Sequence, residues 1–267
     1  MRDQVFSAIT SKSLASLVIA PRQGNRGVAW SRGLFRENDI AALVTDSLQR
    51  LELDFWTPHS PPSPQESRTL LVVGLPPLIL THLRVFATVS DQLLFRVIQA
   101  AGSSLEVADV YFETVPGHQG VLDAFLPASS TLRSLRFAAN PTCEAVELLK
   151  RGPAHDAQPP FDILLSYLRN LEELFVSASE VSQNVFRLLG PAIRHLEIEA
   201  LNDRSMFSFS PVLVEDLLNT SFHVGLASFT LLDTQALWTV GEVAQIRRAC
   251  RARGIKFVFV ADRKSVV

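Results

Sequence analysis

The chain has 267 residues, and its 25 Lys and Arg against 27 Asp and Glu give a formal net charge of −2 at pH 7. So balanced a charge argues against a strongly basic nucleic-acid-binding protein. With 47% hydrophobic and 19% charged residues, the chain is not of the disordered class. The longest apolar run, Leu70 to Leu80, spans 11 residues and is interrupted by two prolines, so we expect no membrane-spanning helix. Two cysteines cannot form a disulfide framework, and we expect a cytoplasmic or nuclear protein.

Leucine accounts for 38 residues, about one in seven, and much of this excess belongs to one short pattern. The pattern is apolar-x-x-apolar-x-apolar, and its copies recur at a mean spacing of 30 residues. The nine copies lie at 14–19, 48–53, 80–85, 105–110, 132–137, 171–176, 193–198, 226–231 and 254–259. Their last two apolar positions are two residues apart, the period at which strand residues face one side of a sheet. Each copy is therefore predicted to be a strand.

Stretches with helical spacing separate the predicted strands. The clearest is 90–101, where apolar residues recur on one helix face and Ser90 is placed as an N-cap. Thr239 and Glu242 have the spacing of a capping box at the start of a helix over 239–252. The other predicted helices cover 36–47, 119–126, 143–150, 161–168, 181–189 and 211–218. A strand and a helix thus alternate about nine times, and stacking such units buries one continuous core.

The copy at 132–140 reads LRSLRFAAN and carries the resemblance to a known family. It matches the leucine-rich-repeat pattern L-x-x-L-x-L-x-x-N/C-x-L through Asn140. The chain therefore resembles leucine-rich-repeat proteins, which implies an α/β solenoid: an open, curved parallel sheet with helices on its convex side. Residues other than Asn or Cys stand at the Asn140 position in the other eight copies, so we expect an irregular solenoid.

Two proline-rich segments, 57–68 and 151–160, interrupt the pattern without contributing apolar anchors. Proline removes a backbone donor and disfavours strand and helix interiors. Because the pattern resumes after each, we interpret them as loops inserted into a single domain that covers 1–267.

Degenerate repeats of uneven length are similar to those of F-box leucine-rich-repeat proteins, of which mushroom-forming (basidiomycete) fungi have large families. This similarity implies recognition of a protein for ubiquitination. No N-terminal F-box pattern is visible, so a ubiquitin-ligase adaptor is expected as a partner only if a longer form carries an F-box.

A closed (β/α)8 barrel is the alternative architecture, because about eight strand–helix units of this length give the usual barrel size of about 250 residues. Such a barrel would be an enzyme, a hydrolase or an isomerase, with catalysis in the loops after its strands. Those loops do carry acidic residues and histidines, including Asp54, His59 and Glu113. The solenoid is favoured because barrel strands do not require the leucine pattern and the chain has no barrel phosphate-loop signature.

His195, Glu197 and Glu199 alternate along one predicted strand, which raises a metal site as an alternative to a solvated acidic stripe. Positions two apart on a strand lie ~6.5–7 Å apart, which is awkward for ligands at ~2.0–2.2 Å from one ion. Neither cysteine has a histidine close in sequence, and the chain has no G-x-S-x-G motif. We therefore expect no enzyme, no catalytic residues, no metal and no cofactor.

A basic run near the C-terminus comprises Arg247, Arg248, Arg251, Arg253 and Lys256. It could bind an acidic partner, but cations also suit the C-terminal end of a helix. We favour the solvated face of a terminal helix.

The sequence thus predicts a non-catalytic scaffold that binds a protein partner on its concave strand face, with no membrane or nucleic-acid partner. The residues expected to bind are Arg84, Phe86, Asp109, Tyr111, Arg136, Phe175, Glu197 and Glu199. Exposed aromatic residues flanked by arginine are typical of binding hot spots. The alternative for each aromatic residue is that it packs against neighbouring side chains. Arg84 and Arg136 flank Asp109 in this arrangement and could pair with it when no partner is bound.

Overall fold

The computed structural model describes residues 14–19, 47–55, 75–87, 91–112, 118–139, 160–177, 181, 185–200, 225–233 and 238–261. The segments 57–68 and 151–159 lie outside these residues, as do the predicted helices at 143–150 and 211–218. All but the last residue of the predicted helix at 36–47 also lies outside them.

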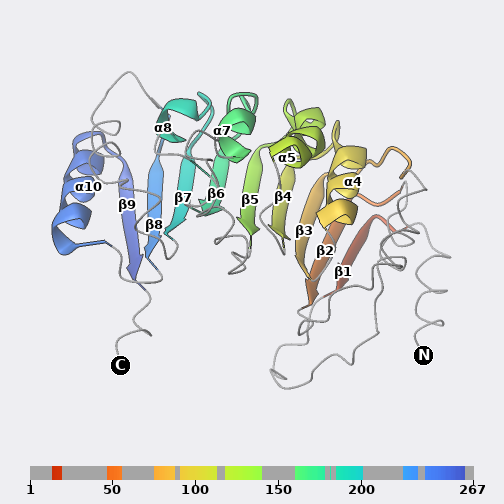
Figure 1. The fold of residues 1–267 in the computed structure, drawn as a ribbon, viewed down its shortest axis with the longest axis horizontal. Coiled ribbons are helices and arrows are strands. Elements are labelled where there is room, and N and C mark those ends of the chain that lie inside the picture. The colour runs from red at the N-terminus through yellow and green to blue at the C-terminus, as the bar shows by residue number, and fades with distance from the viewer. Residues whose placement is uncertain are drawn as a thin grey trace, which may run out of the picture.

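Nine strands form a single parallel sheet, and their order in the sheet is their order in the sequence (Figure 1). The strands are Ser16–Ile19 (β1), Arg50–Phe55 (β2), His82–Ala87 (β3), Val107–Phe112 (β4), Ser134–Ala139 (β5), Glu173–Ser177 (β6), His195–Ala200 (β7), Ser228–Asp233 (β8) and Lys256–Ala261 (β9). β1 and β9 stand at opposite ends of the sheet, which is therefore open. The alternative of a closed barrel is wrong.

The predicted anchors meet in one line across the sheet. The second apolar residue of every copy pairs in register with that of the next: Leu17, Leu51, Leu83, Ala108, Leu135, Leu174, Leu196, Phe229 and Phe257. Each strand begins two residues after the start of its copy. The first apolar residue lies before the strand, and at Leu80, Leu105 and Leu132 it is fully buried there.

The last copy departs from the pattern for a structural reason. Gly254 stands where the other copies have an apolar residue, and its φ of 71° is left-handed. Glycine adopts this conformation without steric cost, and it commonly follows the end of a helix. The next residue, Ile255, is buried in the core instead.

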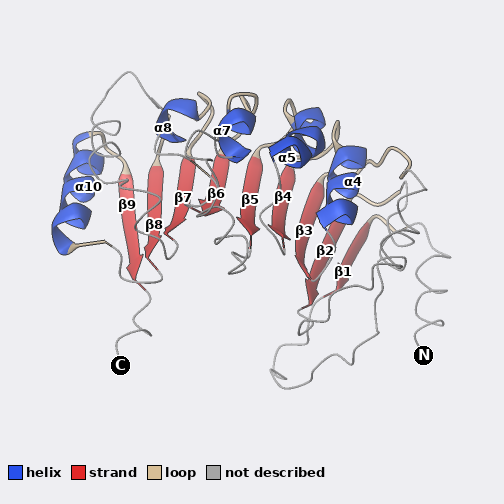
Figure 2. Cartoon of the chain, in the orientation of Figure 1, coloured by secondary structure: helices blue, strands red, loops and turns tan. Residues whose placement is uncertain are grey.

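The described helices lie along one side of the sheet (Figure 2). They are α4 (Asp91–Ala101), α5 (His118–Phe125), α7 (Pro160–Leu165), α8 (Val185–Leu188) and α10 (Val240–Ala252), with a 3-10 helix, η1 (Leu126–Ala128), after α5. Pro160, predicted as part of an inserted loop, is the first residue of α7, a position that suits proline because its missing N–H is not needed there. None of these described helices combines the length and apolar character needed to span a membrane.

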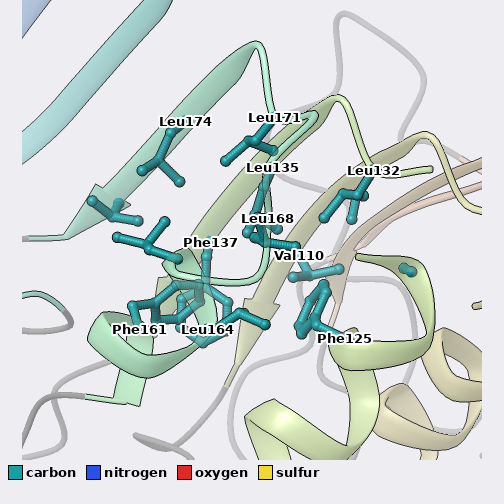
Figure 3. Close-up of a cluster of buried hydrophobic side chains, with 14 of the residues drawn as sticks. Val110, Phe125, Leu132, Leu135, Phe137, Phe161, Leu164, Leu168, Leu171 and Leu174 are labelled. Carbon is teal, nitrogen blue, oxygen red and sulfur yellow. The ribbon is translucent and has the colours of Figure 1, made fainter. Parts of the chain in front are cut away.

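The core fills the space between the helices and the anchor side of the strands. Figure 3 shows Phe161 and Leu164 of α7 pointing toward Phe137 of β5, and the rings of Phe137 and Phe161 meet edge-on with centroids 4.2 Å apart. Phe186 of α8 meets Phe229 of β8 in the same way at 5.5 Å. We call the other side of the sheet, which no described helix covers, the open face.

The capping box predicted at α10 is present. The Thr239 hydroxyl accepts a hydrogen bond from the backbone N–H of Glu242 at 3.2 Å, and the Glu242 carboxylate accepts one from the backbone N–H of Thr239 at 2.8 Å. We expect Thr239→Ala to lower the free energy of unfolding by about 1 kcal/mol, because one N-terminal N–H loses its acceptor. Thermal or urea denaturation measures this loss. Thr239→Ser should restore the stability, and Val240→Ala, at a side chain 88% exposed, should change it little.

Candidate functional site

One row of side chains crosses the open face from β2 to β7. Its members pair in register from strand to strand: Glu52, Arg84, Asp109, Arg136, Phe175 and Glu197. Adjacent parallel strands lie ~4.7–4.9 Å apart, so neighbours in such a row are within side-chain reach. We call this set the charged row, because its charge alternates in sign from Glu52 to Arg136.

Asp109 lies between two arginines, as predicted. Its Oδ2 is 3.6 Å from Nε of Arg84, and its Oδ1 is 3.9 Å from Nε of Arg136. Arg136 also reaches past Phe175, with its Nη2 3.8 Å from a carboxylate oxygen of Glu197. These separations are those of ion pairs and exceed the 2.7–2.9 Å typical of charge-assisted hydrogen bonds. The guanidinium groups are therefore attracted to Asp109 without being hydrogen-bonded to it.

Aromatic rings orient both guanidinium groups. The Arg84 Cζ lies 5.3 Å from the ring centroid of Phe86, and the Arg136 Cζ lies 4.0 Å from that of Phe175. Both distances are within the ~6 Å range of cation–π attraction. The ring of Phe86 in turn stacks on Tyr111, with centroids 6.5 Å apart and an interplanar angle of 22°. Seven of the eight predicted binding residues, all but Glu199, thus form one connected cluster.

Phe175 lies in the charged row, but the expectation that its ring is exposed is wrong. Only 8% of the residue is accessible, because the guanidinium group of Arg136 covers the ring from the open face. Ser177 of the same strand is also buried. Arg136, whose side chain is 46% exposed, is therefore the solvent-accessible group over Phe175.

Two carboxyl groups of the open face have raised pKa values. Burial raises the pKa of Asp109 above its ordinary value, while the charges of Arg136 and Arg84 lower it and that of Glu52 raises it. Oδ1 of Asp109 is buried and accepts no hydrogen bond. Burial likewise raises the pKa of Glu199, which Arg136 lowers and Glu197 raises. For both groups, loss of solvation therefore outweighs the attraction of the arginines.

A pH-dependent stability difference follows for Asp109→Asn. A raised pKa in the folded state means that ionisation of Asp109 disfavours folding, and this cost disappears as the pH falls through that pKa toward the ordinary value of 3.8. At pH 7 the variant should unfold at a denaturant midpoint no lower than that of the wild type, despite losing two ion pairs. Any increase in the variant's midpoint over that of the wild type should shrink as the pH is lowered to about 4. Glu106→Gln, at an exposed carboxylate just before β4, is the control. A clearly lower midpoint for Asp109→Asn at pH 7 would contradict the balance described above.

Two of the three residues of the alternative metal site, His195 and Glu197, have other partners. Nδ1 of His195 lies 2.8 Å from the Ser228 hydroxyl, and Glu197 pairs with Arg136. Within the described ranges, no three His, Cys, Asp or Glu side chains are grouped as metal ligands would be. The face of β7 is thus built into the polar surface of the sheet.

Helix α10 packs on β9, at the end of the sheet and beyond the strands that carry the charged row. Arg247, Arg248 and Arg251 are exposed on α10, as expected for a solvated helix face. Cys250 of the same helix is buried, and this burial raises the pKa of its thiol to about 11. A thiol that is protonated and buried at neutral pH is a poor nucleophile. Cys143 lies outside the described residues.

The set of binding residues predicted from the sequence lacks Glu52, which the structure places at one end of the charged row. Glu52 accepts a hydrogen bond from Nε of Arg50 at 2.8 Å and pairs in register with Arg84. The available signal was its position, since Glu52 occupies the same place in its copy of the leucine pattern as Arg84 does in the next.

Comparison with known proteins does not indicate a function, so the proposal below rests on the geometry described above. No protein-family model matches the chain, and a search of curated proteins finds no match either.

Proposed function

We propose that this chain is a non-catalytic scaffold that binds a protein partner across its open face. The observation that carries the proposal is the charged row with the adjoining Phe86–Tyr111 stack, on a face that no described helix covers. Arginine and aromatic side chains held in fixed positions provide large contact areas at a low cost in conformational entropy. Their proximity to carboxylates adds the polar groups that define which partner fits.

In its finer form, the proposal makes the fold an irregular leucine-rich-repeat solenoid and the open face its concave side. The sequential strand order, the in-register anchors and the helices along one side support this form. We further propose a cytoplasmic or nuclear protein that recognises a substrate for a ubiquitin ligase. The support for that role is the resemblance of the leucine pattern to F-box leucine-rich-repeat proteins.

Site-specific photo-crosslinking in cells tests the proposal. In one variant, a benzophenone amino acid replaces Ala138 of β5, which pairs in register with Tyr111 of β4. In a second variant, it replaces Leu126 of η1, which is 43% exposed. Proteins attached after irradiation are identified by mass spectrometry, and each candidate is then purified and titrated against the wild-type chain. We expect a protein that crosslinks from position 138 and not from 126, and that binds in the titration. Crosslinking from 126 alone, or none from 138, contradicts binding at the open face.

A further inference from the structure

The arginines in the strands and just before them that pair with carboxylates fall into two groups by the distance between their guanidinium groups and the carboxylates nearest to them. Arg50 donates to Glu52 from Nε at 2.8 Å, and Arg133 donates to Glu172 from Nη1 at 2.7 Å. Arg84 and Arg136 lie 3.6–3.9 Å from their carboxylate partners. In the part of the chain that the structure describes, neither of these two guanidinium groups makes a side-chain hydrogen bond.

Unused donors on an oriented guanidinium group favour an incoming oxyanion. Each guanidinium group has five N–H donors in a planar fork that matches a carboxylate. Phe86 and Phe175 hold the two groups in place, and about half of each arginine side chain is exposed, 50% for Arg84 and 46% for Arg136. The donors are thus oriented and accessible from the open face.

Asp109 brings these two groups together. It pairs with Arg84 through one carboxylate oxygen and with Arg136 through the other, so the guanidinium groups converge on one point from β3 and β5. Its side chain is 20% exposed, and Oδ1 is buried without a hydrogen bond. Asp109 therefore offsets only one of the two positive charges and accepts no hydrogen bond from either guanidinium group.

We propose that Arg84 and Arg136 form a clamp for an Asp or Glu side chain of an acidic segment of the protein partner. The partner's carboxylate approaches from solvent and accepts hydrogen bonds from the two guanidinium groups. These hydrogen bonds replace the ion pairs that the arginines make with Asp109. An apolar residue next to that carboxylate packs on the Phe86–Tyr111 stack beside Arg84. This inference rests on the proposed function and names the chemistry of the partner.

The carboxylates around the clamp oppose such a partner to different degrees. Glu52 is hydrogen-bonded to Arg50. Glu197 lies 3.8 Å from Arg136, on the side away from Asp109, and Glu199 of the same strand also attracts Arg136. Asp109 is the competitor that acts on both arginines, because its negative charge attracts the two guanidinium groups together. Burial already raises the pKa of Asp109. Removing this charge should therefore strengthen the binding of an acidic partner.

A selection from a phage-displayed random peptide library against the purified full chain provides the probe. Wild type is used for selection, and the Arg84→Gln/Arg136→Gln variant, checked for folding by circular dichroism, is used for counter-selection. We expect the enriched peptides to contain Asp or Glu next to an apolar residue. If the double variant does not fold, Arg84→Lys/Arg136→Lys replaces it, since lysine keeps the charge but cannot make the paired contact.

Fluorescence anisotropy with the most enriched peptide then measures affinity. Loss of a charge-assisted hydrogen-bonded contact should weaken binding about tenfold or more for Arg84→Gln and for Arg136→Gln. Asp109→Asn should tighten binding. Arg50→Gln is the matched control, because it removes the same charge from the same face at an arginine already hydrogen-bonded to Glu52, and it should change the affinity by less than these variants do.

Several results would overturn the clamp. These are enrichment of Lys- or Arg-rich peptides, weaker binding by Asp109→Asn, equal binding by the arginine variants, or no enrichment at all. The proposed function fails separately, when no protein crosslinks from position 138. A partner that crosslinks there and binds the arginine variants with wild-type affinity leaves the scaffold intact and removes the clamp.

Discussion

Leu135→Ala should lower the free energy of unfolding by about 2–5 kcal/mol, the range for emptying a buried leucine site. Leu135 is the second residue of β5 and is 1% exposed. Figure 3 shows it among leucines of neighbouring segments, including Leu132 and Leu168. Neighbours held by strands and helices on several sides cannot close the resulting cavity completely, so lost contacts add to lost hydrophobic transfer. Urea denaturation followed by circular dichroism measures the change.

Two further leucines define the outcome. Leu196 of β7 occupies the position in its strand that Leu135 occupies in β5, and both residues are 1% exposed. Leu196→Ala should therefore lower the free energy of unfolding by a similar amount. Leu126→Ala deletes the same atoms at an exposed site on η1 and should cost much less. If neither Leu135→Ala nor Leu196→Ala shifts the denaturation midpoint, these positions are not core anchors.

Replacing both Phe86 and Tyr111 by alanine should remove most of the partner's binding. The two rings stack on each other in the open face, and Arg84 lies over Phe86. A few central aromatic residues commonly dominate the energy of an interface, and their loss would also free Arg84 from the orientation that the ring imposes. The affinity of the partner identified by crosslinking is measured by titration with the purified double variant.

The double variant must stay folded for this test. Both residues are only half-buried, so the loss of stability should be much smaller than for Leu135→Ala. Val260→Ala, at a side chain 47% exposed on β9, removes apolar surface far from the stack and should leave binding unchanged. A folded double variant that binds with wild-type affinity would move the binding site to the helices or to the basic face of α10.

Individual elements show how far local pattern predicts this fold. The helix expected at 90–101 is α4, Asp91–Ala101, and the capping box expected at Thr239 starts α10, because both depend on residues within one or two turns. The strands begin two residues later than their pattern copies. The leucine pattern predicts which side chains are buried, not where the strand begins. The first apolar residue of a copy lies in the turn before the strand and is buried there.

The sequence predicted most of the residues of the candidate site, but it did not predict the contacts between their side chains. Alternation along each strand placed Arg84, Asp109 and Arg136 on one face, and their in-register pairing follows from anchors that align across the sheet. The burial of Phe175 did not follow from its own strand. It depends on the guanidinium group of Arg136, which is 39 residues away in the sequence and adjacent in the sheet.

The sequence by itself determined the number of strands, the residues that anchor them and the face to which each polar residue belongs. It did so because the two-residue period of a strand is local, and every copy repeats it. Only the tertiary structure decided that the sheet stays open rather than closing into a barrel, since an anchor pattern is compatible with either curvature. It also decided that Asp109 holds two arginines without hydrogen bonds, because such distances depend on side chains brought together from strands far apart in the chain.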